Sequence, residues 1–270
     1  MHFWVLFDCV LIFSFGTAVG SFINAFEYRL RHKEPIAFSR SRCPNCHHLL
    51  AWFDLIPLLS FVLLRGRCRY CGERISLQYP LVELVTGFLF IAFYVGCRLG
   101  NLEWAVGTHY LLLFFILACL EIIFLYDLKY GLIPDEVVLP ASLITLIYQF
   151  FAALFGVAGC PISQLPSSLF NCMFNYLGSG IGAAVFFLFL AAITRGKGMG
   201  GGDVKLAVLM GLVLGFPGIV YALYIAFISG AVVSLFLIFL RKKKFGQTVP
   251  FGPFLVAGTL LIMFLGGVSG

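Results

Sequence analysis

Residues 106–127 read VGTHYLLLFFILACLEIIFLYD, and this stretch decides the fold class. Its mostly apolar run is about 20 residues long, which is the length that an α-helix needs to cross the hydrocarbon core of a bilayer. The chain as a whole has the same character, with 61% hydrophobic and 11% charged residues and a mean hydropathy of +1.02. Soluble globular proteins do not have this composition. The sequence therefore predicts an all-α polytopic membrane protein.

Apolar runs of similar length recur along the chain and predict its transmembrane helices. We expect about eight, at 3–25, 78–98, 106–126, 135–156, 168–193, 203–216, 218–240 and 250–268. The sixth run is short and glycine-rich, so its start is the least defined of these boundaries. No Lys or Arg precedes the first run, so we do not expect a cleavable signal peptide.

Basic residues fall almost entirely in alternate connections, which sets the orientation, because cytoplasmic loops are rich in Lys and Arg. An outside N-terminus places all of the 18 Lys and Arg residues except Arg98 on the cytoplasmic side. The net charge of +6 is then explained by topology and by membrane lipid headgroups, and it indicates no nucleic-acid partner. We expect three parts, a first transmembrane helix at 1–26, a cytosolic loop at 27–77 and a membrane domain at 78–270.

The cytosolic loop carries two CxxC pairs, Cys43 with Cys46 and Cys68 with Cys71, separated by 21 residues. Four thiolates arranged in this way form the tetrahedral site that structural zinc uses, and the cytosol keeps thiols reduced. A redox pair is the alternative, but neither pair opens a helix in a βαβ context. The loop is therefore predicted to bind zinc. The apolar stretch 52–61 between the pairs is too short to span and is expected on the membrane surface or against the helices.

A glycine-rich stretch, Gly198-Met199-Gly200-Gly201-Gly202-Asp203, precedes the sixth apolar run. Glycine lets another backbone approach closely, so this run suits a substrate peptide held beside the Asp203 carboxylate. The alternative is that Gly200, Gly201 and Gly202 only form a turn and that Asp203 caps the following helix.

Acidic residues within membrane segments are candidates for function because their burial is costly. Asp127 ends the third run, where the helix macrodipole disfavours a carboxylate, so we do not expect it to cap a helix. An ion pair with Lys129 is the alternative for Asp127. Asp135 follows Pro134 at the start of the next helix, which is an ordinary place for an acid. Asp127 and Asp203 are therefore predicted to meet at one membrane face, share a proton and hydrolyse a peptide bond.

The remaining polar residues of the membrane segments have less specific interpretations. Glu83 is either structural or part of a second site, and Asn24 binds either substrate or a neighbouring helix. Glu121 is expected to make a hydrogen bond within the helix bundle. A disulfide on the outer side remains open among four cysteines, Cys9, Cys97, Cys160 and Cys172.

Taken together, these residues resemble the prepilin peptidase family, the bifunctional type IV leader peptidases of the GxGD aspartyl class. The resemblance covers the whole chain. It rests on Gly20-Ser21 with Asn24, the two CxxC pairs with Arg65-Gly66-Arg67, Tyr79-Pro80-Leu81-Val82-Glu83, Asp127-Leu128-Lys129, Ile133-Pro134-Asp135, Gly200-Gly201-Gly202-Asp203 with Lys205, and Pro250-Phe251-Gly252-Pro253-Phe254. It implies that Asp127 and Asp203 are catalytic. It also implies that the three glycines, Lys129, Lys205, Glu83 and Asn24 bind substrate or form structural motifs.

The family resemblance implies two reactions in the bacterial cytoplasmic membrane on type IV prepilin-like precursors. The basic leader is removed at the cytoplasmic face, and the new N-terminal amine is methylated from S-adenosylmethionine. The chain has no soluble segment large enough for a Rossmann domain, so the methyl-donor site must be built from the loop and helix ends.

Two other classes of function remain open from the residues alone. An ion-coupled transporter would use Glu83, Glu121, Asp127 and Asp203 as a relay, but the two aspartates lie at the membrane edge and the chain shows no internal repeat. A zinc-containing membrane scaffold without catalysis would leave the glycine run unexplained.

Overall fold

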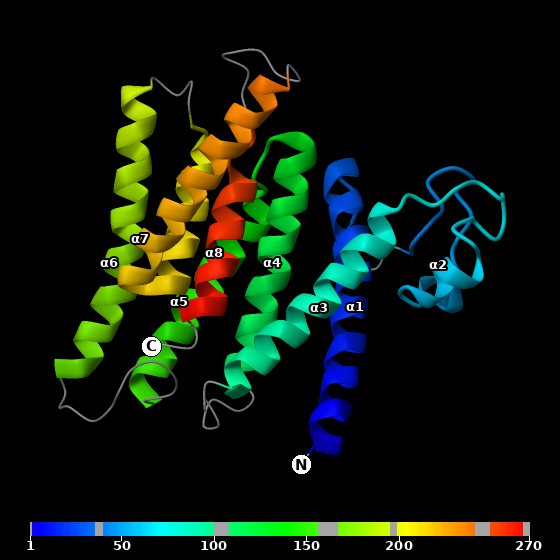
Figure 1. Ribbon diagram of the computed structural model, residues 1–270, viewed down its shortest axis with the longest axis horizontal. Helices are drawn as coiled ribbons and strands as arrows, with labels where there is room; N and C mark the ends of the chain where they lie inside the picture. The colour runs from blue at the N-terminus through cyan, green and yellow to red at the C-terminus, as the bar shows by residue number, and fades with distance from the viewer. Residues whose placement is uncertain are drawn as a thin grey trace. The chain divides into compact units, whose positions relative to one another are not determined.

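A computed structural model describes residues 2–35, 40–99, 108–155, 167–194, 199–240 and 249–266. Within these ranges the chain is helical (Figure 1). The long helices are α1 (His2–His32), α3 (Gln78–Leu99), α4 (Thr108–Tyr130), α5 (Asp135–Phe155), α6 (Ser167–Ile193), α7 (Gly201–Phe239) and α8 (Gly252–Gly266). A short 3-10 helix, η1 (Trp52–Leu55), and α2 (Leu59–Leu63) lie between α1 and α3. The chain divides into two compact units, unit 1 over residues 1–95 and unit 2 over residues 96–270.

The membrane segments agree with the predicted all-α polytopic fold. In the part of the chain that the structure describes, six helices are long and apolar enough to cross a bilayer, and α8 is apolar but shorter. Helix α7 consists of two helical segments, so the prediction of about eight apolar segments is confirmed. The largest difference from the predicted boundaries is in α1, which continues to His32 instead of ending at residue 25.

Unit 2 is built around α7, which packs against α6, α8 and α5, while α4 packs against α8 and α5. In Figure 1 the red helix α8 runs between α4 and α7. Helices α6 and α7 approach closely at Gly211, where an added Cβ would lie 2.5 Å from the Cα atom of Gly180. Small residues at such crossings let backbones pack directly, which drives helix association in lipid.

The two segments of α7 are separated by a break at Gly215 and Phe216, whose torsion angles are not helical. Gly215 has a φ of 62°, a left-handed conformation that glycine adopts without steric cost. Asn175 on α6 covers the exposed backbone, because its Oδ1 accepts from the Phe216 amide at 2.6 Å and its Nδ2 donates to the Phe216 carbonyl at 3.1 Å. Unsatisfied backbone groups are costly in a membrane, so this side chain stabilises the break.

Unit 1 joins α1 and α3 to the loop that carries the cysteines. The two helices cross at small residues. An added Cβ at Gly20 would lie 2.7 Å from the Cα atom of Glu83, and one at Gly16 would lie 2.9 Å from that of Gly87. In the loop, Trp52 and Leu63 are 76% and 70% exposed, so η1 and α2 leave apolar side chains uncovered by unit 1.

The outer-side cysteines are only partly described. Cys9 and Cys97 are free thiols, whereas Cys160 and the side chain of Cys172 lie outside the described residues.

Candidate active site and metal centre

The four cysteines of the CxxC pairs converge in unit 1. The Sγ atoms of Cys43, Cys46, Cys68 and Cys71 all lie within 4.8 Å of one another, and those of Cys43 and Cys71 are 3.9 Å apart. A tetrahedral zinc ion with Zn–S bonds of about 2.3 Å holds its sulfur ligands about 3.8 Å apart. The donor set and its spacing therefore fit structural zinc.

Both CxxC pairs adopt the same turn. The amide of Cys43 donates to the His48 carbonyl and the Cys43 carbonyl accepts from His47, while Cys68 makes the equivalent bonds with Glu73 and Gly72. The residue after each second cysteine has a positive φ, 56° at His47 and 73° at Gly72. Glycine adopts this left-handed conformation without steric cost, so Gly72 suits the second turn. The equivalent position of the first turn is filled by histidine, which no local pattern indicated.

Amide hydrogen bonds favour the thiolate in the first turn. Burial raises the pKa of the Cys43 thiol, but hydrogen bonds from the backbone of Cys46 and Asn45 outweigh it and lower the pKa to about 7. Thiolates are the form that binds zinc.

A second set of polar contacts ties η1 to the second turn. The side chain of Asp54 is only 3% exposed and accepts from Arg69 Nε at 2.8 Å, from the Tyr70 hydroxyl at 3.1 Å and from the Ala51 amide at 3.2 Å. Burial would raise the pKa of Asp54, but these hydrogen bonds, led by that of Arg69, hold it below its usual value. Sequence reasoning missed Asp54, because its partners are 15 and 16 residues away in a loop without periodicity.

Asp127 lies near the end of α4 and is 4% exposed. Its carboxylate is hydrogen-bonded by the backbone of Gly252 at the start of α8. The expectation that Asp127 caps no helix is therefore wrong, because α4 ends against the N-terminus of another helix. Among the described residues its buried Oδ2 atom has no hydrogen-bond partner. One carboxylate oxygen is thus left for a water molecule or a ligand.

Asp203 lies in the first turn of α7. Its Oδ2 atom accepts from the Gly200 amide at 3.0 Å, so Asp203 does cap the helix, as one of our two interpretations stated. The glycines before it differ in their surroundings. An added Cβ at Gly202 would lie 2.9 Å from Ile133, whereas one at Gly201 would meet no atom of the described residues within 4 Å. The backbone at Gly201 is therefore open to a second chain.

The two aspartates are electrostatically coupled, because the charge of Asp203 acts on the carboxyl of Asp127. They come from the ends of two helices of unit 2 that are linked through α8. Lys205, one turn into α7, does not join them. It lies 2.7 Å from both carboxylate oxygens of Asp135, so this exposed pair connects the first turns of α5 and α7. We had interpreted Asp135 only as a favourable helix-terminal charge.

The other predicted residues lie elsewhere. Lys129 is at the end of α4, with its Nζ 6.0 Å from the centre of the Tyr130 ring. Asn24 is 2% exposed and donates to the carbonyls of Gly20 and Tyr79, so it links α1 to α3. Glu83 is buried in unit 1, where its Oε2 accepts from the Leu58 amide at 2.8 Å.

Comparison with known protein families gives two adjoining matches. The model of the Bacterial Peptidase A24 N-terminal domain matches residues 14–97, which include the four cysteines. The model of the Type IV leader peptidase family matches residues 113–235, which include Asp127 and Asp203.

Curated proteins named prepilin leader peptidase/N-methyltransferase are similar along most of the chain. One from Bacillus subtilis (strain 168) is 34% identical over 260 residues, covering 95% of this chain and 94% of the relative. One from Aeromonas hydrophila is 32% identical over 288 residues, with 97% and 91% covered. One from Pseudomonas aeruginosa is 31% identical over 273 residues, with 92% and 88% covered. No solved structure matches the chain significantly.

Proposed function

Because this chain belongs to the type IV leader peptidase family, we propose that it is a bifunctional membrane enzyme. It cleaves the leader from type IV prepilin-like precursors at the cytoplasmic membrane face and then methylates the new N-terminal amine with S-adenosylmethionine. Relatives that align over nearly their whole length are named for both a peptidase and a methyltransferase activity, which supports both parts of the proposal. The distribution of basic residues supports a bacterial inner-membrane location with the N-terminus outside.

The observation that carries the peptidase assignment is the coupled pair of aspartates. Asp127 is buried, feels the charge of Asp203 and keeps one oxygen without a partner among the described residues. Two carboxyl groups whose charges repel each other do not both lose their protons readily, so one keeps its proton while the other is charged. A proton donor and a proton acceptor are then available at one site.

Peptide hydrolysis needs both of these roles. The ionised carboxylate takes a proton from water as the water oxygen attacks the scissile carbonyl carbon, and the protonated carboxyl donates a hydrogen bond to the carbonyl oxygen. When the carbon–nitrogen bond breaks, the leaving nitrogen receives a proton from the pair and departs as an amine. The open backbone at Gly201 supports a place for the substrate strand beside Asp203.

The second reaction consumes the amine that the first releases. The uncharged amine attacks the methyl carbon of S-adenosylmethionine with its lone pair. The carbon–sulfur bond breaks with its electrons left on sulfur, which yields S-adenosylhomocysteine, and the methylated nitrogen loses a proton to solvent. Zinc at the four cysteines would hold the loop turns together and take no part in either reaction.

A double assay on the purified full-length chain tests the proposal. A precursor and a labelled methyl donor are supplied together, and leader loss and methyl transfer are read by mass spectrometry. Asp127→Asn and Asp203→Asn should each abolish cleavage, since removing one member of a catalytic unit costs about as much as removing both. An asparagine Oδ1 still accepts from the Gly200 amide, so Asp203→Asn tests the acid and not the cap.

The matched control is Asp135→Asn, which changes an exposed carboxylate on a neighbouring helix. Near-normal cleavage by a well-expressed Asp127→Asn or Asp203→Asn variant would refute the assignment of the pair. Cleavage without any methyl transfer by the unmodified chain would refute the second activity.

A further inference from the structure

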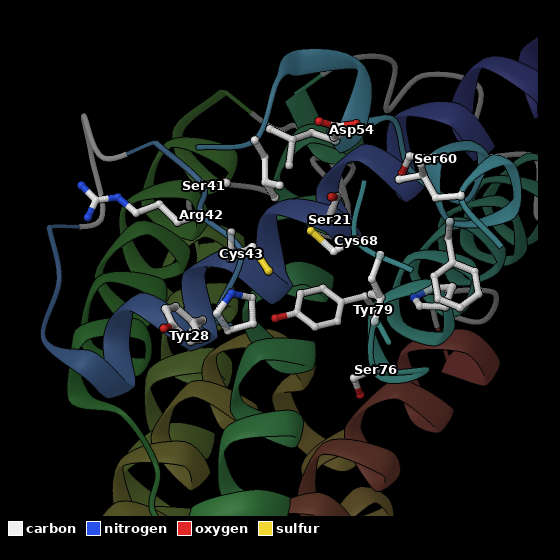
Figure 2. A pocket seen from close by; sticks show the side chains of 18 of the residues that line it. Ser21, Tyr28, Ser41, Arg42, Cys43, Asp54, Ser60, Cys68, Ser76 and Tyr79 are labelled. Carbon is white, nitrogen blue, oxygen red and sulfur yellow. The ribbon is translucent and has the colours of Figure 1, made fainter. Parts of the chain in front are cut away.

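Helix α2, in the loop that carries the cysteines, has two different faces. Ser60 and Phe61 line a pocket of unit 1, and Figure 2 shows Ser60 in the wall of this pocket. Leu59, Val62 and Leu63 do not line it and are 52%, 69% and 70% exposed. Their spacing of three and four residues places them on one side of the helix. A helix of five residues is too short to cross a bilayer, so this face is not a transmembrane surface.

Another large apolar side chain is exposed on η1, which packs against α2. This side chain is Trp52, at 76% exposure. Tryptophan is enriched where a membrane meets water, because its ring is apolar and its N–H group is polar. Together with the three residues of α2, Trp52 makes up an apolar loop surface that unit 1 leaves uncovered. Exposed apolar patches of this kind mark contacts with another protein or with a membrane.

The position of α2 along the helices of unit 1 favours a membrane. The Leu58 amide, which precedes α2, donates to Glu83 on α3 at 2.8 Å, and Glu83 also accepts from the Ser21 hydroxyl of α1. Ser21 lies 11 residues before the end of α1 at His32, or about 16 Å along its axis. It also belongs to the apolar run 3–25 that predicts the membrane span. The start of α2 is therefore held beside the inner boundary of the hydrocarbon core and not beyond the ends of the helices.

The charge next to the apolar loop surface has one sign. Residues 55–72 contain three arginines and no Asp or Glu. Arg69 is paired with Asp54, whereas Arg65 and Arg67 are exposed. Anionic lipid headgroups attract basic residues that lie close to the membrane surface. A bilayer with anionic headgroups thus matches both the apolar side chains and the guanidinium groups, as it does for other segments that lie in the interface.

We propose that the apolar loop surface docks into the cytoplasmic leaflet of the membrane. Val62 and Leu63 enter the region where the acyl chains begin, and Arg65 and Arg67 donate hydrogen bonds to the phosphate groups of anionic phospholipids. This inference goes beyond the proposed activity. It gives the cysteine loop a third attachment to the membrane, in addition to the two helices that it connects.

Fluorescence quenching of the full-length chain in lipid vesicles tests the docking. The reporter is Val62→Trp in a chain whose natural tryptophans, Trp4, Trp52 and Trp104, are replaced by phenylalanine, which keeps position 52 apolar. The vesicles contain phosphatidylcholine and phosphatidylglycerol with bromine on the acyl chains near the headgroup, and acrylamide is the uncharged quencher in water. The brominated lipid should quench the reporter several-fold more than acrylamide does.

Asn45→Trp in the same background is the matched reporter on the water side. Asn45 is exposed in the first cysteine turn, and this turn follows Ser41, whose hydroxyl lies 3.5 Å from Arg29 near the end of α1. This reporter should be quenched by acrylamide and not by the brominated lipid. Leu63→Trp is a second reporter on the apolar face, so the result does not depend on one substitution. Thermal unfolding shows that each variant is folded.

The contribution of charge is measured by adding Arg65→Gln and Arg67→Gln to the Val62→Trp chain. One arginine near an anionic surface changes the docking equilibrium about fivefold, so the double substitution should shift it about 25-fold toward the undocked loop. Quenching by acrylamide should then rise, and the same change should follow when phosphatidylglycerol is omitted from the vesicles. Quenching that does not depend on phosphatidylglycerol would refute the role of anionic headgroups.

Two results overturn the docking itself. If acrylamide alone quenches both Val62→Trp and Leu63→Trp, the apolar loop surface lies in water. If neither quencher acts on them, the surface is covered by protein, either by unit 2 or by a second copy of the chain. None of these measurements uses leader cleavage or methyl transfer, so failure of the docking is distinguished from failure of the proposed function.

Discussion

Gly252 offers the sharpest test of the Asp127 assignment, because replacing it with alanine moves the carboxylate without changing any titratable group. An alanine Cβ at this position would lie 2.5 Å from Oδ2 of Asp127 and 3.0 Å from its Cγ. Ordinary contact begins at 3.4 Å, so the oxygen must move by about 0.9 Å. The surrounding helices leave the carboxyl 4% exposed, so the movement also disturbs its neighbours.

The size of this displacement sets the expected effect on catalysis. Misplacing a reacting group by about 1 Å costs on the order of 100-fold in rate. We therefore expect kcat/KM for leader cleavage to fall about 100-fold in Gly252→Ala, which corresponds to about 2.7 kcal/mol of transition-state stabilisation.

The assay is steady-state cleavage of a precursor by the full-length chain, with thermal unfolding in detergent as the check on folding. Gly182→Ala is the matched control, because Gly182 is on the exposed side of α6 and an added Cβ there meets no atom within 4 Å in the part of the chain that the structure describes. Cleavage by a folded Gly252→Ala variant at the rate of the Gly182→Ala control would show that the position of Asp127 does not matter for the reaction.

Three further predictions concern the metal, an ion pair and acid stability. Cys43→Ser should lower the zinc content measured by elemental analysis and reduce methylation more than cleavage, whereas a chain that carries no zinc before substitution would contradict the metal assignment. Asp135→Asn breaks the exposed pair with Lys205, which is worth about 0 to 1 kcal/mol, so thermal unfolding should change little and cleavage should persist; loss of cleavage would contradict this. The lowered pKa of Asp54 means that its carboxylate stabilises the loop above pH of about 4 and loses that effect as the pH falls through the folded-state pKa. Asp54→Asn should therefore lower the free energy of unfolding by about 1 to 3 kcal/mol at neutral pH and break the ion pair with Arg69. It should also remove this acid-dependent step from unfolding curves followed by tryptophan fluorescence, and an unchanged dependence of unfolding on pH would contradict the prediction.

The membrane segments and the metal site were predictable because each depends on a local pattern. Apolar runs give the helices, and the boundary expected between the runs 203–216 and 218–240 coincides with the break that the structure has at Gly215 and Phe216. The CxxC spacing gives the four ligands of the metal site without any knowledge of the loop. In these cases the decisive residues lie within a few positions of one another.

The contacts that sequence reasoning missed join residues that are far apart in the chain. Asn175 is 41 residues from the backbone that it covers, and Lys205 is 70 residues from Asp135. Asp127 and Gly252 are brought together only by the packing of α4 against α8. Neither periodicity nor charge pattern contains information on such pairs, because they depend on how helices are arranged in unit 2.

The break in α7 also fixes a length. Asn175 holds the backbone at Phe216, so the C-terminal end of the first segment of α7 has a fixed position. Asp203 lies twelve residues before Gly215, or about 18 Å along the helix axis. Each residue added to or removed from this segment would shift Asp203 by about 1.5 Å and turn it by about 100° around the helix. The number of residues in this segment therefore sets the position and the direction of the Asp203 side chain, whichever apolar residues the segment contains.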